Sequence, residues 1–152
     1  MKSFRDSTIL LVEDDPRDEE LTLRALRRHK IGDEIIVARD GEEALDVLSA
    51  RGERANSDPS ALPTLVLLDL KLPKIDGIEV LRQLRANART KLLPVVILTS
   101  SDEEQDRLAG YTTGASSYVR KPVDFGEFTE AVRQLGLYWL VLSEPPPPTG
   151  RP

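Results

Sequence analysis

Short apolar runs alternate along this chain with longer segments whose apolar residues recur at helical spacing. A run of four or five apolar residues bounded by turn formers is typical of a strand that a parallel sheet buries on both faces. The run LVLL at residues 65–68 has this character and is predicted to be a central strand. In all, strands are predicted at residues 8–12, 34–38, 65–68, 94–98 and 117–119.

Helical signals occupy the segments between these strands. Residues 17–30 carry leucine and alanine at helical spacings and end in the basic sequence RRHK, which suits a helix carboxyl end. Asp15 is the predicted N-cap of this helix, and Pro16 suits its first position. Gly114 is a natural terminus for the fourth helix. Further helix starts are indicated by Asp40 with Glu43, Ser101 with Glu104, and Asp124 with Glu127, and Asp76-Gly77 marks a turn before the third helix.

Strand and helix therefore alternate five times, interrupted by a polar loop at residues 52–63. This alternation predicts an α/β fold, a doubly wound five-stranded parallel sheet with helices on both faces and right-handed crossovers. The commonest small version of this architecture is flavodoxin-like, with strand order 2-1-3-4-5, and we expect that order here.

Composition narrows the classes of function. The 152 residues suit one domain, and 31% charged with 39% hydrophobic residues is ordinary for a soluble globular protein. A net charge of -5 argues against nucleic acid as a partner. The absence of cysteine excludes disulfides and thiol chemistry. We see no signal peptide and no membrane span, so we expect a cytoplasmic protein.

Polar and charged side chains follow the carboxyl ends of the predicted strands. Asp69 comes directly after the central strand, where packing alone would not place a charge. Glu13, Asp14 and Asp15 follow the first strand, Thr99 ends the fourth, and Lys121 follows the fifth. Because the carboxyl ends of the strands line one crevice in this fold, we expect these side chains to converge.

Several carboxylates in one crevice repel one another and need a cation, and oxygen ligands on loops favour Mg²⁺. Lys121 and Thr99 suit a phosphoryl group, and Asp69 beside a metal ion and a lysine has the setting of a nucleophile toward phosphorus. Each residue also has a structural explanation: Asp14 and Asp15 as a helix cap, Thr99 as a strand end, Lys121 as a solvated charge. Their joint occurrence at the ends of the right strands favours an aspartyl phosphate site.

The motifs ILLVEDDP, LVLLDLKLPKIDGIEVL, VVILTSS and GASSYVRKPVDFGEF carry a family resemblance. They are similar to the receiver domain of two-component response regulators, over about residues 7–136 and in the same order. The resemblance implies that Asp69 accepts a phosphoryl group from the histidine of a sensor kinase, as a phosphoacceptor that promotes its own phosphorylation and dephosphorylation.

The resemblance also assigns the neighbouring residues. Glu13 and Asp14 would be the acidic pair, and Asp14, Asp69 and the backbone carbonyl of Lys71 would bind Mg²⁺, with Mn²⁺ as a substitute. Lys121 would pair with the phosphoryl oxygens, ahead of a cis peptide bond to Pro122. Thr99 and Tyr118 would form a switch in which the hydroxyl moves onto the phosphoryl group and the aromatic ring turns inward.

Two residues depart from the receiver pattern. Glu13 stands where many receivers have Asp, which should alter the water network of the metal. Lys71, two residues after the nucleophile, places a cation near the phosphoryl site, and we hypothesise that it changes the lifetime of the phosphoryl group. The alternative is a lysine that points to solvent and contributes only its carbonyl.

We divide the chain into a receiver domain at residues 1–136 and an apolar extension with a Pro-rich tail at residues 137–152, and we expect no output domain. The sequence LGLYWLVL is apolar on every side of a helix and needs cover. It either folds back on its own sheet or, as we prefer, forms a homodimer interface. The candidate interface residues are Leu137, Tyr138, Trp139, Leu140 and Leu142.

The run GLYWLVLSEPPP and the long loop before Thr64 resemble the single-domain regulators paired with bacterial phytochromes. That narrower resemblance would make the partner a red-light-sensing histidine kinase. His29 is the only histidine, and its place in RRHK predicts a surface charge rather than a relay residue.

Other functions fit part of this pattern. A phosphatase of the haloacid dehalogenase type also uses a strand-end Asp, Mg²⁺, Thr or Ser, and Lys, but it usually needs a second Asp where this chain has Lys71. A pseudo-receiver that only binds partners would not need the set of Asp14, Asp69, Thr99 and Lys121. A flavin-binding version of the fold would need a phosphate-cradling loop after the first strand, and none is seen.

Overall fold

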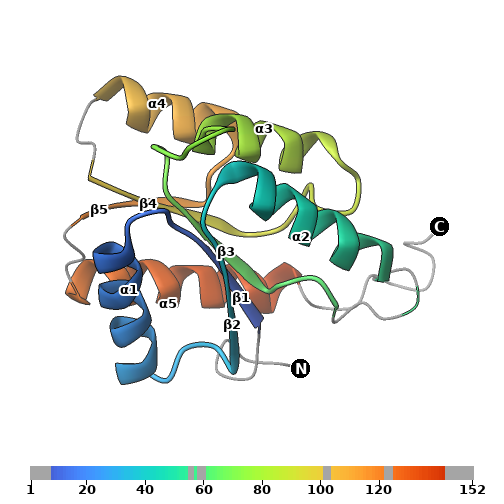
Figure 1. The fold of residues 1–152 in the computed structure, drawn as a ribbon. Coiled ribbons are helices and arrows are strands. Elements are labelled where there is room, and N and C mark those ends of the chain that lie inside the picture. Colours follow the sequence, from blue (N-terminus) through green and yellow to red (C-terminus); the bar gives the residue numbers. More distant parts are fainter. Residues whose placement is uncertain (1–7, 55–56, 58–60, 101–103, 122–124, 143–152) are drawn as a thin grey trace.

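The computed structural model describes residues 8–54, 57, 61–100, 104–121 and 125–142, and for 104–105 and 135–142 the description is of the backbone. Five strands and five helices alternate along the chain (Figure 1). The strands are β1 (Thr8–Val12), β2 (Glu34–Ala38), β3 (Leu65–Leu68), β4 (Val95–Thr99) and β5 (Ser117–Arg120). The helices are α1 (Pro16–Arg28), α2 (Gly41–Arg54), α3 (Gly77–Ala86), α4 (Glu104–Thr113) and α5 (Phe125–Leu142).

The five strands form one parallel sheet in the order β2-β1-β3-β4-β5, which confirms the predicted fold and strand order. Val12 at the end of β1 pairs with Ala38 of β2 and with Leu68 of β3, and Leu68 pairs with Ile97 of β4. This register brings the carboxyl ends of the strands to one edge of the sheet.

Helices cover both faces of the sheet: α1 and α5 lie on one face, and α2, α3 and α4 on the other (Figure 1). Alternate residues of each central strand enter the two apolar clusters, because successive side chains point to opposite faces. Leu67 packs in the cluster with Leu26 of α1 and Phe128 of α5, whereas Leu68 packs in the cluster with Leu48 of α2 and Leu81 of α3.

The N-terminal caps of the helices agree with the sequence where they are described. The Asp15 carboxylate accepts hydrogen bonds from the backbone N–H groups of Arg17 (2.8 Å) and Asp18 (3.3 Å). Asp40 likewise accepts from Glu43 at 2.7 Å. The predicted caps Ser101 and Asp124 lie outside the described residues.

Small differences appear at the element ends. The fourth strand begins at Val95 rather than residue 94, because proline has no N–H for the ladder. The fifth strand extends one residue further, to Arg120, which pairs with Thr99. Gly114 follows the fourth helix with a positive φ of 117°, a conformation that L side chains rarely adopt.

The prediction of a surface-exposed His29 was wrong. This residue is the C-cap of α1 and is half-buried, with its ring centroid 6.1 Å from that of Phe125. Its Nε2 atom is buried without a hydrogen-bond partner among the described residues. The sequence pattern of α1 could not indicate this contact, because Phe125 lies on α5. Within the described part of the chain, no helix is long and apolar enough to cross a membrane.

The acidic site at the carboxyl edge of the sheet

The sheet brings Glu13, Asp14 and Asp69 together, as the sequence predicted. Carboxylate oxygens of these three residues all lie within 4.8 Å of one another. Two of the three residues are held by extensions of the parallel ladder past the strand ends. The Glu13 N–H donates to the Ala38 carbonyl at 2.9 Å, and the Asp69 N–H donates to the Val12 carbonyl at 3.1 Å. Glu13 and Asp69 are buried, whereas Asp14 is exposed at the mouth of the site.

Lys121 enters the same site from the end of β5. Its backbone N–H donates to the carbonyl of Thr99 at 2.8 Å, which places the start of its side chain beside β4. Its ammonium group forms a buried ion pair with Glu13 and lies 3.5 Å from an Asp69 carboxylate oxygen. The lysine is therefore not the solvated charge that the structural alternative described.

A third carboxylate contacts Lys121, and sequence reasoning missed it. Asp18, in the first turn of α1, has an oxygen 3.1 Å from the lysine Nζ. An acidic residue in a first turn is explained by the helix dipole alone, so its type and position gave no functional signal. The contact depends on how α1 sits against β5, 103 residues further along the chain.

Burial and charge oppose each other at this site. Burial raises the pKa of Glu13 to about 7, although the ion pair with Lys121 acts to lower it. Burial alone would lower the pKa of Lys121, but hydrogen bonding to Glu13 and Asp18 and the charge of Asp69 together raise it above its ordinary value. The ammonium is therefore charged at neutral pH, as a group that pairs with phosphoryl oxygens must be.

The loop after β3 frames the site on its other side. The Lys71 N–H donates to an Asp69 carboxylate oxygen at 3.4 Å. Asp14, Lys71 and Asp76 contribute to the lining of a pocket of about 380 Å³ at the mouth of the acidic cluster. The Lys71 ammonium pairs with Asp106 of α4 at 3.5 Å, although most of the lysine side chain remains exposed.

Gly77 allows α3 to begin against the backbone of Asp69. Its N–H donates to the Leu70 carbonyl at 2.9 Å. A Cβ atom at this position would lie 2.2 Å from the Asp69 carbonyl oxygen and 2.7 Å from the Leu70 Cα. Only glycine permits this approach without a backbone shift.

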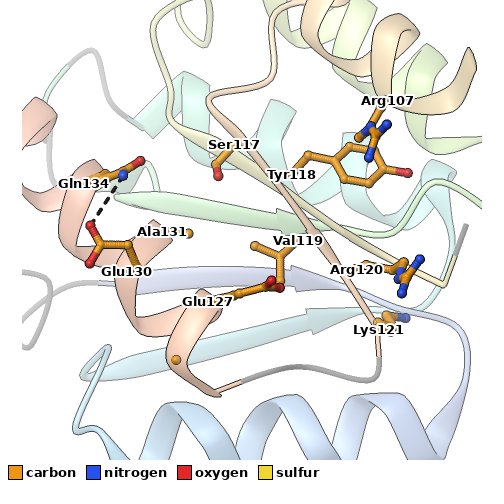
Figure 2. Close-up of a pocket in the computed structure, with 11 residues that line it drawn as sticks. Arg107, Ser117, Tyr118, Val119, Arg120, Lys121, Glu127, Glu130, Ala131 and Gln134 are labelled. Atoms are coloured by element: carbon orange, nitrogen blue, oxygen red, sulfur yellow. Dashed lines mark hydrogen bonds between the residues drawn. The ribbon is translucent and has the colours of Figure 1, made fainter. Parts of the chain in front are cut away.

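Thr99 and Tyr118 occupy different surroundings. Thr99 is fully buried at the end of β4, whereas Tyr118 of β5 is half-buried, with its ring centroid 6.4 Å from that of Tyr111 on α4. Tyr118 lines a pocket of about 780 Å³ that β5 shares with α4 and α5. Figure 2 shows the side chains that line it. The pocket is lined, among others, by Arg107, Tyr118, Arg120, Lys121, Glu127, Glu130 and Gln134. It lies directly beside the acidic site, because Lys121 belongs to both.

Two groups of predicted residues lie outside what the structure describes. Pro122, and with it the predicted cis peptide bond, is not among the described residues. Helix α5 continues through Leu142, but the side chains of 135–142 are not described. This range includes all the interface candidates: Leu137, Tyr138, Trp139, Leu140 and Leu142.

A parallel sheet that gathers Asp69, an acidic pair and a lysine at its carboxyl edge defines a class of signalling domain. The model of the response regulator receiver domain matches residues 9–133, and the chain belongs to this family. Members of the family are typically phosphoacceptors rather than enzymes acting on other substrates.

Individual relatives match this chain over most of their own length. The response regulator Rcp1 from Synechocystis is 39% identical over 132 residues, covering 87% of this chain and 88% of that protein. The probable methanogenesis regulatory protein FilR2 from Methanothrix harundinacea is 39% identical over 140 residues, covering 92% of this chain and 88% of that protein. The chain is thus similar to regulators of about its own length.

Solved structures agree with both the fold and the family. The bacteriophytochrome response regulator AtBRR is 50% identical, with a TM-score of 0.74, covering 88% of this chain and 95% of that one. The Mn²⁺-bound form of Rcp1 has a TM-score of 0.69 at 39% identity, covering 88% and 94%. The phosphorylated cyanobacterial phytochrome response regulator RcpA has a TM-score of 0.71 at 36% identity, covering 89% and 94%.

The acidic cluster fits a divalent metal ion. Glu13, Asp14 and Asp69 offer only oxygen ligands, and they are close enough together for one ion to draw on them. Burial of two carboxylates with a single lysine leaves negative charge that a cation would neutralise. The sequence-based expectation of a divalent metal is therefore supported by the chemistry of the donor set.

Proposed function

We propose that this protein is a response regulator that accepts a phosphoryl group on Asp69 from a sensor histidine kinase. The single observation that carries the proposal is the position of Asp69. It is buried at the end of the central strand, with Lys121 at 3.5 Å and the acidic pair within 4.8 Å. A carboxylate with a cation on one side and a divalent-metal site on the other has the surroundings of an activated nucleophile.

The chemistry follows from these positions. A carboxylate oxygen of Asp69 attacks the phosphorus of the kinase phosphohistidine, and an O–P bond forms as the P–N bond breaks. The histidine nitrogen leaves with the bonding electron pair and takes up a proton from solvent. Lys121 holds a positive charge where the transferred phosphoryl oxygens arrive, which stabilises the charge of the transition state.

Mg²⁺ is the proposed metal, with Mn²⁺ as a substitute. Asp14, Asp69 and the Lys71 carbonyl would hold the ion, and Glu13 would complete the acidic set around it. When bound, the ion neutralises the phosphoryl oxygens and orients them for in-line transfer. The Mn²⁺-bound form of Rcp1 supports a divalent ion in a similar chain.

Thr99 and Tyr118 are the proposed switch. Thr99 is buried, and its carbonyl accepts the backbone N–H of Lys121. Thr99 also pairs with Arg120 of β5, and the half-buried Tyr118 lies two residues earlier on the same strand. Movement of the Thr99 hydroxyl onto the phosphoryl group would open space for the ring, and the surface shared by α4, β5 and α5 would change with it.

A phytochrome-type kinase is the proposed partner class. AtBRR and RcpA are named as phytochrome response regulators, and 50% identity to AtBRR supports a related partner. FilR2, which is 39% identical, is named as a probable regulator of methanogenesis, so the proposal of a phytochrome-type kinase rests on the higher identity to AtBRR. We also propose a homodimer through the C-terminal part of α5, where the sequence is apolar on every side.

Intact mass after incubation with Mg²⁺ and a small phosphodonor such as acetyl phosphate tests the main proposal. We expect one phosphoryl adduct that decays slowly and is absent from Asp69→Asn. Steady release of phosphate from varied monoesters would instead indicate a phosphatase. Absence of both adduct and turnover, with the donor and with a phosphorylated kinase, would leave a pseudo-receiver that only binds partners.

A further inference from the structure

The Lys121 ammonium has three carboxylate neighbours among the described residues, and they differ in kind. Glu13 and Asp69 belong to the acidic cluster that fits a divalent ion. Asp18 does not belong to that cluster, yet its oxygen lies closer to the lysine Nζ, at 3.1 Å, than the oxygen of Asp69 at 3.5 Å. One of the three partners is therefore independent of the metal site.

The lysine and a metal ion need the same oxygens. A divalent ion that draws on Glu13 and Asp69 brings a double positive charge next to an ammonium that is already bonded to them. The two cations repel, and neither is well screened because the lysine and both carboxylates are buried. The lysine must then either leave the site or keep a partner that the metal does not use.

Asp18 has the position that such a partner requires. It lies in the first turn of α1, a helix whose start is set by the Asp15 cap and Pro16. Its own N–H is bonded to Asp15 at 3.3 Å, so its backbone is held in place whether or not a metal is present. Its side chain is one-third exposed, so its negative charge costs less desolvation than that of Glu13.

We propose that Asp18 is a positioning residue that retains Lys121 at the site when Glu13 and Asp69 serve the metal ion. This inference rests on the proposed function and adds a residue to it. Without Asp18, the lysine stays on the two shared carboxylates and competes with the metal, or turns away and no longer meets the incoming phosphoryl group. Asp18 thus supports both metal binding and transfer without touching the reacting atoms.

A matched set of variants separates this role from the other effects of an acidic residue. Asp18→Asn keeps the shape and removes the charge, and Asp18→Glu keeps the charge. Glu19→Gln removes the same charge from the same helical turn, where Glu19 pairs with Arg39 at 3.2 Å and not with Lys121. Free energies of unfolding identify any variant that is merely destabilised.

The first measurement is the dissociation constant for Mg²⁺ by isothermal titration calorimetry, which does not depend on phosphorylation. We expect Asp18→Asn to weaken binding about tenfold, as for other residues that hold a metal-site group in place. Glu19→Gln should weaken it less than about twofold, because the Glu19 charge is paired with Arg39 and not with Lys121. Equal constants for Asp18→Asn and Glu19→Gln would overturn the proposal.

The second measurement is the rate of adduct formation against acetyl phosphate concentration at saturating Mg²⁺. For Asp18→Asn we expect the maximal rate to fall about tenfold while the donor concentration at half-maximal rate does not rise. Asp18→Glu should recover most of the rate. A maximal rate for Asp18→Asn equal to that of the parent would overturn the positioning role. If the parent protein forms no adduct, the proposed function is refuted, and the Mg²⁺ dissociation constants alone then test the role of Asp18.

Discussion

The Lys71 ammonium lies 3.5 Å from the Asp106 carboxylate, and this ion pair joins the loop after Asp69 to helix α4. The Lys71 side chain is two-thirds exposed (66%), and that of Asp106 is 24% exposed. The sequence left open whether Lys71 faces the phosphoryl site or solvent. The structure gives a third arrangement, in which the largely exposed lysine is paired with Asp106 of α4.

This pair predicts opposite effects of two substitutions on the phosphoryl lifetime. A phosphoryl group on Asp69 would compete with Asp106 for Lys71, so Asp106→Asn strengthens the pull of the lysine on the phosphoryl group and Lys71→Asn abolishes it. We expect autodephosphorylation rates of the two variants to change in opposite directions relative to the parent. Each should alter the free energy of unfolding by less than about 1 kcal/mol, since the lysine of the pair is largely exposed.

The control for this pair is Lys74→Asn in the same loop. Lys74 pairs with Asp40 at 3.6 Å and Glu42 at 3.8 Å rather than with α4, and its positive φ of 68° suits Asn. It should leave the lifetime unchanged. Unchanged lifetimes in both Lys71→Asn and Asp106→Asn would show that the lysine contributes only its backbone.

Gly77→Ala should damage both stability and the site. The new Cβ would collide with the Asp69 carbonyl oxygen at 2.2 Å, so the backbone of Asp69 must shift. We expect a loss of about 1–3 kcal/mol in the free energy of unfolding by urea, as for other overpacked sites, and a slower phosphorylation. The matched control is Gly52→Ala inside α2, where the Cβ would meet Arg89 at an ordinary 3.4 Å. The free energy of unfolding of that variant should rise by up to about 1 kcal/mol, because alanine has a higher helix propensity than glycine. Equal effects of the two substitutions would contradict the steric argument.

Arg85 is predicted to be a structural residue at the amino edge of the sheet, the edge opposite the acidic site. Its guanidinium donates to the backbone carbonyls of Gly114 at 2.9 Å and of Leu93 at 2.7 Å, and so ties the loop before β5 to the loop before β4. Arg85→Ala would leave these carbonyls without their charged donor, and we expect a loss of about 2–4 kcal/mol in the free energy of unfolding. Arg82 lies one turn away, is exposed and pairs with Glu79. Arg82→Ala should therefore lower the free energy of unfolding by less than about 1 kcal/mol. A small loss for Arg85→Ala would mean that water replaces the guanidinium.

The raised pKa of Glu13 predicts a pH dependence of the metal-free protein. Because burial raises that pKa from 4.5 to about 7, the folded state binds more protons than the unfolded state between these values. The free energy of unfolding should therefore fall as pH rises from about 4.5 to 7 and then level off with respect to this group. The raised pKa of Lys121 acts only at alkaline pH, outside this window.

Urea unfolding in EDTA across this range, with Glu13→Gln beside the parent, measures the effect. The variant should lack this fall, so the difference between the two proteins should change with pH. Divalent metal affinity should rise over the same range, since the ion requires the deprotonated carboxylate. A difference that is constant from pH 5 to 8 would show that Glu13 is ionised throughout.

The apolar end of α5 predicts an association equilibrium. Leu140→Glu places a charge on the segment that we propose as the homodimer interface, and it should shift the protein toward monomer in analytical ultracentrifugation. Thr129→Glu on the exposed face of the same helix is the control and should not change the sedimentation coefficient. If the parent is a monomer at high concentration, the apolar segment serves its own domain and the dimer proposal fails.

The sequence by itself determined the fold and the convergence of the main candidate site residues. Apolar runs mark the strands because a parallel sheet buries both faces, and the alternation with helices leaves few topologies. Asp69, Glu13 and Lys121 could be placed together because the ends of parallel strands meet at one edge, whatever the helices do. The position of a residue relative to its own strand is local information, and the sequence carries it directly.

Only the tertiary structure decided the contacts that helices make with that edge. The ion pair of Asp18 with Lys121, the pair of Lys71 with Asp106, and the contact of His29 with Phe125 all join elements that are distant in the sequence. Each depends on the rotation of a helix about its axis and on its distance from the sheet. Those quantities follow from how the side chains of two elements pack together, and no single segment of the sequence contains both halves of that packing.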